Sequence, residues 1–110
     1  MTEKSVQNAI MRVFATRSDI RLWRSNSGVA RIGSRTVRFG IPGQADLTGI
    51  LSDGRRLEIE AKSATGRLSD DQRAFGAMIG AFGGVYIIAQ SVADVWAALV
   101  EAGYDLEKTE

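Results

Sequence analysis

The apolar positions of this chain follow helical spacing near both ends. In residues 2–16, apolar side chains recur every three or four positions, which is the spacing of one buried helix face. The same spacing follows Ser69 and Ser91, and serine is a favoured helix N-cap residue. Gly103 is placed to end the last helix. The sequence therefore predicts three helices, with "VYIIA" (residues 85–89) as a buried strand before the last one.

Between these helices the pattern is that of strands separated by turns. "IRLW" and "RTVRF" look like strands, and the turn signals "SNSG" and "GS" lie between them. "DLTGIL-SDG-RRLEIEAK" predicts a hairpin whose three-residue loop ends at Gly54. This register sets Leu47 opposite Ile59 and Asp46 opposite Glu60, and it keeps the apolar side chains of both strands on one face. A two-residue loop would mix the faces, so we expect the longer loop.

These elements predict an α/β (α+β) fold with the order α-β-β-β-β-α-β-α, a mixed β-sheet flanked by helices. The length suits a single domain over residues 1–110. No segment is long and apolar enough to span a membrane, and no signal peptide precedes Thr2. We therefore expect a cytoplasmic protein that has no membrane partner.

Two absences from the composition narrow the possible chemistry. The chain contains no cysteine, which excludes disulfides, thiol nucleophiles and thiolate zinc sites. It also contains no histidine, which excludes the usual general base and every histidine-ligated metal. Catalysis would have to use carboxylates, Lys, Arg, Tyr or hydroxyl groups. The metal that suits such groups is hard and oxygen-loving, such as Mg²⁺ or Mn²⁺.

Charge is unevenly distributed along the chain. Residues 1–40 hold eight basic and two acidic residues, whereas residues 41–110 hold six basic and eleven acidic ones. Arginine outnumbers lysine eleven to three, and arginine is the better bidentate phosphate ligand. A basic half beside an acidic half fits a nucleic-acid enzyme. The alternative is a solvated surface with an accidental gradient.

The predicted hairpin brings together the residues with the most distinctive chemistry. Asp46 and Glu60 face each other, and Lys62 lies on the same side two residues further along the strand. Two carboxylates this close repel each other, and a divalent cation would remove the repulsion. Lys62 would then orient a water molecule or offset the charge of a phosphate. Glu58 shares the face and competes with Glu60 as the principal acid, and the simplest alternative is a solvated strand edge.

The stretch "FGIPGQADLTGIL-SDGRRLEIEAKSATGRLSDDQRAF" resembles the VRR-NUC (virus-type replication-repair nuclease) domain of the PD-(D/E)XK nuclease superfamily. The similarity extends from the "TEKSVQ" helix through "GGVYIIA". It implies a restriction-endonuclease-like fold and a metal-dependent phosphodiesterase that acts on DNA. One departure is the separation of Pro42 from Asp46 by three residues, a form that the VRR-NUC domains share.

The resemblance also implies roles for individual residues. Asp46 and Glu60 would be metal ligands, the Ala61 carbonyl a further ligand, and Lys62 the catalytic lysine. Glu3 would match the acidic residue of the family's first helix, and Gln72 the glutamine after the turn. Gln72 also completes a capping box with Ser69, which alone would explain it. Glu3 is explained equally well as a first-turn acid that favours the helix N-terminus.

Partners and location are implied by the same resemblance. Related stand-alone domains of this length are viral and prophage enzymes, so we expect a homodimer that cuts branched DNA in the cytoplasm of a bacterium or phage-infected host cell. The candidate phosphate contacts are basic residues of the first forty positions, Arg24, Arg31, Arg35 and Arg38, with Arg21 in the same group. Trp23 and Tyr86 are expected to lie in the core. The main alternative function is a non-catalytic nucleic-acid-binding module on a nuclease-like scaffold, and a structural or assembly protein is a third.

Overall fold

The computed structural model describes residues 1–25 and 28–107. The elements of these residues run in the order α1 (Glu3–Phe14), β1 (Ile20–Arg24), β2 (Gly28–Ile32), β3 (Arg35–Phe39), β4 (Leu47–Leu51), β5 (Arg56–Ala61), α2 (Asp70–Ala81), β6 (Val85–Ala89) and α3 (Val92–Glu101). The predicted α+β class is confirmed. The structure adds one strand, β2, to the predicted order. The short "GVARI" segment becomes a strand because it pairs with β3 across a tight turn, in which Gly33 takes a φ of +62°.

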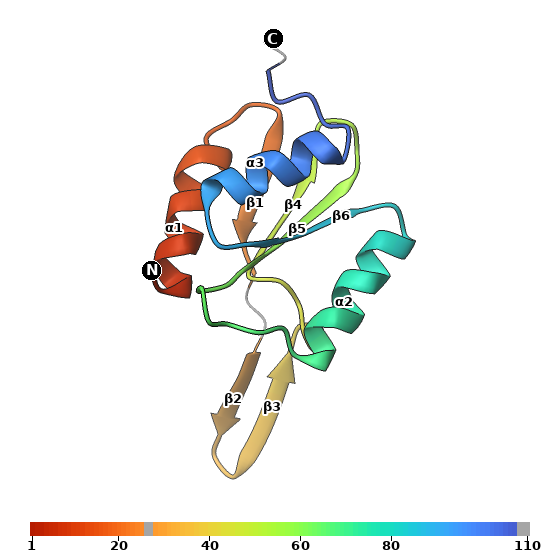
Figure 1. Ribbon diagram of the computed structural model, residues 1–110. Helices are drawn as coiled ribbons and strands as arrows, with labels where there is room; N and C mark the ends of the chain where they lie inside the picture. Colours follow the sequence, from red (N-terminus) through yellow and green to blue (C-terminus); the bar gives the residue numbers. More distant parts are fainter. Residues whose placement is uncertain (26–27, 108–110) are drawn as a thin grey trace.

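Four strands form a mixed sheet in the order β1-β4-β5-β6. The pairs β1–β4 and β4–β5 are antiparallel, whereas β5–β6 is parallel and is connected through α2. Helices α1 and α3 cover one face of this sheet, and α2 covers part of the other (Figure 1). Strand β5 is therefore internal in the sheet and lies between two helical layers.

The predicted register of the central hairpin is confirmed. Leu47 pairs with Ile59 and Gly49 with Leu57. The loop between the strands has three residues, because the Leu51 N–H donates to the Arg55 carbonyl oxygen at 2.9 Å. Gly54 ends this loop in the left-handed region, with a φ of +94°.

The main core lies between the sheet and helices α1 and α3. The odd-numbered residues of β5 and the apolar stripes of both helices are buried there. Tyr86 is half-buried against the smaller cluster beneath α2. The prediction that Trp23 lies in the core is wrong, since 48% of this residue is exposed. Trp23 belongs to an edge strand and faces away from the buried side chains Ile20 and Leu22, on the side of the sheet where α2 covers β5 and β6.

Local signals at the helix ends agree with the sequence. Ser69 and Gln72 form a complete capping box at the start of α2. The Ser91 hydroxyl accepts a hydrogen bond from the Asp94 N–H at the start of α3. Gly103 adopts a φ of +80° directly after α3 and ends that helix, as predicted.

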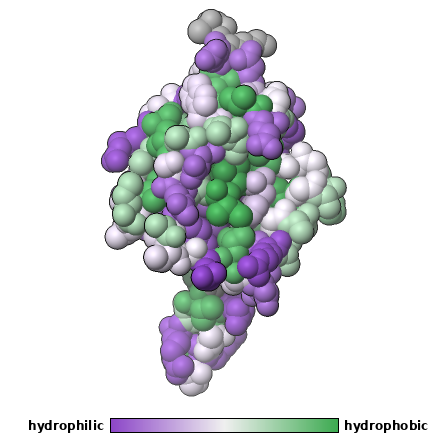
Figure 2. All heavy atoms as spheres, viewed as in Figure 1, coloured by the Kyte–Doolittle hydropathy of each residue, from purple (hydrophilic) through white to green (hydrophobic). Residues whose placement is uncertain are grey.

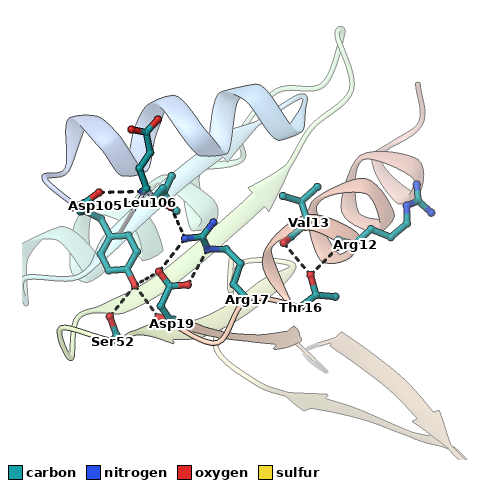
Figure 3. A network of polar contacts seen from close by, with 10 residues as sticks. Arg12, Val13, Thr16, Arg17, Asp19, Ser52, Asp105 and Leu106 are labelled. Atoms are coloured by element: carbon teal, nitrogen blue, oxygen red, sulfur yellow. Dashed lines mark hydrogen bonds and ion pairs between the residues drawn. The ribbon is translucent and has the colours of Figure 1, made fainter. Parts of the chain in front are cut away.

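A polar network fixes the segment after α3 against the start of β1 (Figure 3). Arg17 pairs with Asp19 and also donates to the Leu106 carbonyl oxygen at 2.7 Å. The Tyr104 hydroxyl contacts Ser52 and donates to the Asp19 carbonyl oxygen at 2.8 Å. The pKa of the Asp19 carboxyl is lowered by its hydrogen bond from Arg17, so the pair stays charged at neutral pH. This network lies at the opposite end of the sheet strands from the acidic residues described below.

Among the helices of residues 1–25 and 28–107, none is both long enough and apolar enough to cross a membrane.

Candidate metal centre

Strand β5 places three charged residues on its face toward α2, and all three are buried. Glu58 is fully buried, Glu60 is 2% exposed and Lys62, directly after the strand, is 8% exposed. The interpretation of this segment as a solvated strand edge is therefore wrong, because β5 is paired on both sides. Buried charges are tolerated only when they are paired, hydrogen-bonded or bound to a metal, so each of these groups needs a partner.

Asp46 lies beside Glu60, as the predicted register requires. The ladder between β4 and β5 ends at the Leu47–Ile59 pair, and Asp46 directly precedes it. Asp46 Oδ2 accepts a hydrogen bond from the Ala61 N–H at 2.9 Å, so its side chain continues the pairing where the backbone stops. The Asp46 carbonyl oxygen accepts from the Ser25 N–H at 2.9 Å. These two bonds hold the carboxylate against β5.

The loop that carries Asp46 is pressed against the first turn of α2. A Cβ added at Gly43 would lie 2.1 Å from the Asp71 carbonyl oxygen and 2.6 Å from the Gln72 nitrogen. Gly43 also has a φ of +78°, which side chains rarely adopt. Glycine is therefore required here for two reasons, and its contact fixes the distance between the Asp46 loop and Gln72.

Gln72 joins the helix cap to the acidic pair. Its Oε1 accepts a hydrogen bond from the Ser69 N–H at 2.9 Å, which completes the capping box. Its Nε2 donates to Glu60 Oε2, also at 2.9 Å. One side chain thus caps α2 and contacts Glu60, so the capping box does not exclude the functional role that the resemblance implies for Gln72.

The pKa values of both carboxyl groups, Glu60 and Asp46, are raised. Burial raises the pKa of Glu60 to about 7, and the negative charge of Asp46 adds to this effect. Burial also raises the pKa of Asp46, although the hydrogen bond from Ala61 opposes the rise. Without a cation, the two groups therefore favour a state in which they hold a proton near neutral pH.

Lys62 supplies the nearest positive charge. Its Nζ lies 3.6 Å from Glu60 Oε2, and it lowers the pKa of both acids. Glu3, in the first turn of α1, lies near the Lys62 stem, because a Cβ added at Gly66 would be 3.1 Å from Glu3 Oε2 and 3.2 Å from Lys62 Cδ. The charge of Glu3 raises the pKa of Asp46 and Glu60. One lysine thus faces three acids.

One oxygen of Glu58, Oε2, has partners that differ from those of Glu60. Its Oε2 accepts hydrogen bonds from the Thr48 hydroxyl and from Arg56 Nε, the latter at 2.9 Å. Arg56 also donates to the Thr48 hydroxyl at 3.0 Å, which closes a three-residue network. Glu58 therefore has its own counter-ion, whereas Glu60 depends on Lys62. This distinction favours Glu60 as the acid with capacity for a further cation.

The fit of a divalent metal can be judged from the unsatisfied atoms. Oε1 of Glu60 and Oε1 of Glu58 are both buried without a hydrogen-bond partner in the described part of the chain, but only Glu60 has the second carboxylate, Asp46, beside it. The same region contains no group of three or more acidic side chains placed to hold a metal ion, so Glu3 stands apart from the pair. Mg²⁺ typically binds one or two carboxylates and completes its shell with water and substrate phosphate oxygens. Asp46 and Glu60 fit that mode, with the Ala61 carbonyl as the adjacent backbone oxygen.

The candidate phosphate-binding arginines occupy two places. Arg24 ends β1 and donates hydrogen bonds to Gln7 and Asn8 of α1 at 3.0 and 2.6 Å. The other three belong to the β2–β3 hairpin, and their side chains are exposed. They are Arg31, Arg35 and Arg38. The structure thus does not bring the four arginines into one cluster.

Sequence reasoning missed the burial of this face and the position of Tyr86 beside the acids, although it expected Tyr86 in the core. Tyr86 pairs with Glu58 across the parallel strands, and its hydroxyl is buried with no hydrogen-bond partner among the described residues. Burial, together with the negative charges of Glu60, Asp46 and Glu58, raises the pKa of Tyr86 to about 12. The available signal was the helix between β5 and β6, since a β-α-β crossover makes the strands parallel and covers the face.

Comparison of the chain with protein-family models and with curated proteins finds no match. The resemblance to the VRR-NUC domain therefore rests on the residues quoted above.

Proposed function

We propose that this protein is a Mg²⁺- or Mn²⁺-dependent DNA endonuclease that hydrolyses phosphodiester bonds. The observation that carries the proposal is the half-buried Asp46 beside the buried Glu60, with Lys62 as the closest positive charge. A solvated strand edge would not bury Glu60 and Lys62, because each buried charge is costly without a partner. A divalent cation explains the arrangement.

In this proposal Asp46, Glu60 and the Ala61 carbonyl hold the metal. The metal would polarise a phosphate oxygen and lower the pKa of a bound water. Gln72 keeps Glu60 in its orientation through the 2.9 Å hydrogen bond to Oε2. Lys62 is a poor metal ligand because it is positively charged. Its ammonium group, 3.6 Å from Glu60, is placed to orient a water molecule or to offset charge on the phosphate.

DNA is the proposed substrate because basic residues are concentrated in the first forty positions, before Asp46 and Glu60 in the sequence. The first forty residues carry eight basic and two acidic side chains, and arginine binds phosphate bidentately. Selectivity for branched DNA, action in replication, repair or recombination, and the homodimer follow from the VRR-NUC resemblance and stay predictions.

Supercoiled plasmid DNA tests the proposal. We expect the protein to nick or linearise plasmid with Mg²⁺ or Mn²⁺ and to leave it intact in EDTA. Asp46→Asn and Glu60→Gln should abolish cleavage, whereas Glu101→Gln, which changes an exposed acid on α3, should not. DNA binding without cleavage under any divalent metal would instead favour the non-catalytic binding module.

A further inference from the structure

The β2–β3 hairpin projects from the body of the molecule (Figure 1). Its two strands pack extensively only against each other among the described residues, and the molecule reaches 52 Å along its longest axis. A two-stranded hairpin alone is only marginally stable in water. We therefore expect a binding partner to stabilise the hairpin.

The two faces of this hairpin differ in chemistry. Alternate pairs of the register share a face, so Arg31 and Arg38 lie on one side. The opposite side carries Val37 and Phe39 along its length, with Ile32 and its partner Arg35 next to the turn, and is thus mainly apolar. Ile32 is 63% exposed and Phe39 is 46% exposed. Figure 2 shows hydrophilic surface on the projecting part and hydrophobic surface where it joins the body.

Charge indicates what kind of partner this hairpin would bind. The hairpin, residues 28–39, contains three arginines and no acidic residue. A two-fold contact between two copies of the hairpin would bring arginines close to arginines, and like charges across strands are destabilising. A polyanion has the complementary charge.

The base of the hairpin adjoins a groove next to the acidic pair. Arg38, Val29 and Phe39 line this groove, and its opposite wall is formed by Ser69, Asp71 and Gln72 at the start of α2. Gln72 in turn donates to Glu60. A DNA backbone held along the basic face would therefore lead toward the proposed metal centre.

The apolar face needs a different contact. In an intact duplex the bases are stacked, and their flat surfaces are not available to side chains. Apolar side chains reach them only where steps are unstacked or strands are unpaired.

We propose that the β2–β3 hairpin binds DNA at a point where a duplex opens, with Arg31 and Arg38 on the backbone and Ile32 and Phe39 on unpaired bases. This inference rests on the proposed function, because it assigns to the hairpin the contacts that would bring DNA to the same site. The hairpin would place the backbone next to the opening in the groove beside Gln72.

Fluorescence anisotropy in EDTA, where no metal-dependent cleavage occurs, tests this assignment. The probes are a forked DNA with unpaired arms and a fully paired duplex of the same length. The double variant Ile32→Ser/Phe39→Ser should lose fork affinity by on the order of 10-fold or more, with little change in duplex affinity. The double variant Arg31→Gln/Arg38→Gln should weaken the binding of both probes.

Matched controls change the same residue types elsewhere. Val100→Ser removes an exposed apolar side chain from α3, and Arg12→Gln removes an exposed arginine from α1. Both should bind like wild type. Thermal melting of each variant should match wild type, because the hairpin residues are exposed and lie outside the two cores.

Three results would overturn the inference. The first is unchanged fork affinity in the Ile32/Phe39 variant. The second is wild-type binding of both probes by the Arg31/Arg38 variant. The third is a dimer that dissociates in the Ile32/Phe39 variant while fork affinity stays unchanged, which would make the hairpin a self-association surface.

Plasmid cleavage separates this inference from the proposed function. Hairpin-dependent fork binding by a protein that cuts no DNA with any metal would leave the inference standing and defeat the nuclease assignment. Metal-dependent cleavage by the wild-type protein, together with unchanged fork binding by the hairpin variants, would support the nuclease assignment and defeat the inference.

Discussion

The fold gives the Glu60 carboxyl group an environment that raises its pKa and leaves one of its oxygens unpaired. The residue belongs to an internal strand, so it loses water on both sides, and Asp46 adds a second negative charge beside it. Lys62 and Gln72 each contact only its Oε2. The other oxygen has no partner in the described part of the chain, and a cation would satisfy it.

This arrangement predicts a pH-dependent stability for the metal-free protein. The pKa of Glu60 is raised from 4.5 to about 7, so the folded state binds this proton more tightly than the unfolded chain. The free energy of unfolding should therefore fall as the pH rises from about 4.5 through 7. Asp46 acts in the same direction, because its pKa is also raised. We expect a higher melting temperature in EDTA at pH 5.5 than at pH 8.

The matched comparison is Glu60→Gln against Glu101→Gln. The first variant should lose most of the difference between the two pH values, and the second should keep it. Asp19 and Asp53 do not interfere, since their pKa values are lowered and they titrate below this window. A melting temperature of wild type that rises between pH 5.5 and 8 in EDTA would contradict the buried-pair interpretation.

Lys62 is predicted to act on cleavage rather than on metal binding. Lys62→Met keeps most of the stem and removes the charge, so Mn²⁺ affinity should stay near wild type or increase. The cleavage rate should fall on the order of 10²–10⁴-fold, the range for a positioned catalytic group. Single-turnover plasmid cleavage measures the effect, and Lys4→Met makes the same change at an exposed lysine. Wild-type cleavage by Lys62→Met would remove Lys62 from the mechanism.

At the residue scale, the sequence predicted the acidic pair because it predicted the register. Once Leu47 is set opposite Ile59, Asp46 and Glu60 must be neighbours. The network of Glu58 with Thr48 and Arg56 could not be predicted, since it depends on side-chain orientations that a register does not determine.

At the scale of elements, the site is positioned by the contact between the Asp46 loop and α2. Gly43 lies against the Asp71 backbone, and the same turn of the helix presents Gln72 to Glu60. These two contacts hold together the Asp46 loop, α2 and β5, which are separate in sequence.

Gly43→Ala tests this contact. The added methyl group would collide with the Asp71 carbonyl and would also occupy a strained φ of +78°. We expect a loss of about 2–4 kcal/mol in the free energy of unfolding, and reduced cleavage as the loop shifts. Gly54→Ala is the control, because Gly54 has a φ of +94° but open space around it. Urea unfolding should show a smaller loss for Gly54→Ala, and equal losses would argue against the contact.

The elements were predictable where a strong local signal existed. The capping box of α2 and the glycine that ends the β4–β5 loop are examples, and both are confirmed. Strand β2 was missed because "GVARI" is short and lies next to turn residues, and its pairing with β3 is its main support. Trp23 was misplaced because the edge position of β1 depends on the order of the strands in the sheet, which no local pattern gives.

At the scale of the whole molecule, the two ends of the charge gradient occupy different places. Arg31, Arg35 and Arg38 belong to the projecting hairpin. Glu60 is buried on the face of the sheet toward α2, and Asp46 lies half-buried beside it. The molecule thus has an exposed basic arm next to a buried acidic centre, and the Asp46 loop connects them in sequence.

This separation predicts a salt-dependent affinity for DNA. Binding in EDTA should weaken steeply as NaCl rises, because phosphate contacts release counterions. Arg31→Ala, Arg35→Ala or Arg38→Ala should each lower the slope of log affinity against log salt by about 0.9 for every phosphate group that the variant no longer neutralises. Arg12→Ala on α1 should keep the wild-type slope. Anisotropy at several salt concentrations gives the slopes, and affinity that is independent of salt would rule out the basic arm as the binding element.

The central claim is that the Asp46–Glu60 pair binds a divalent cation, and calorimetric titration with Mn²⁺ at neutral pH tests it most directly. We expect wild type and Lys62→Met to bind Mn²⁺, and Asp46→Asn and Glu60→Gln to lose most of that binding. Glu101→Gln should bind like wild type. Absence of Mn²⁺ binding to the wild-type protein, or undiminished binding to both acid variants, would contradict the claim.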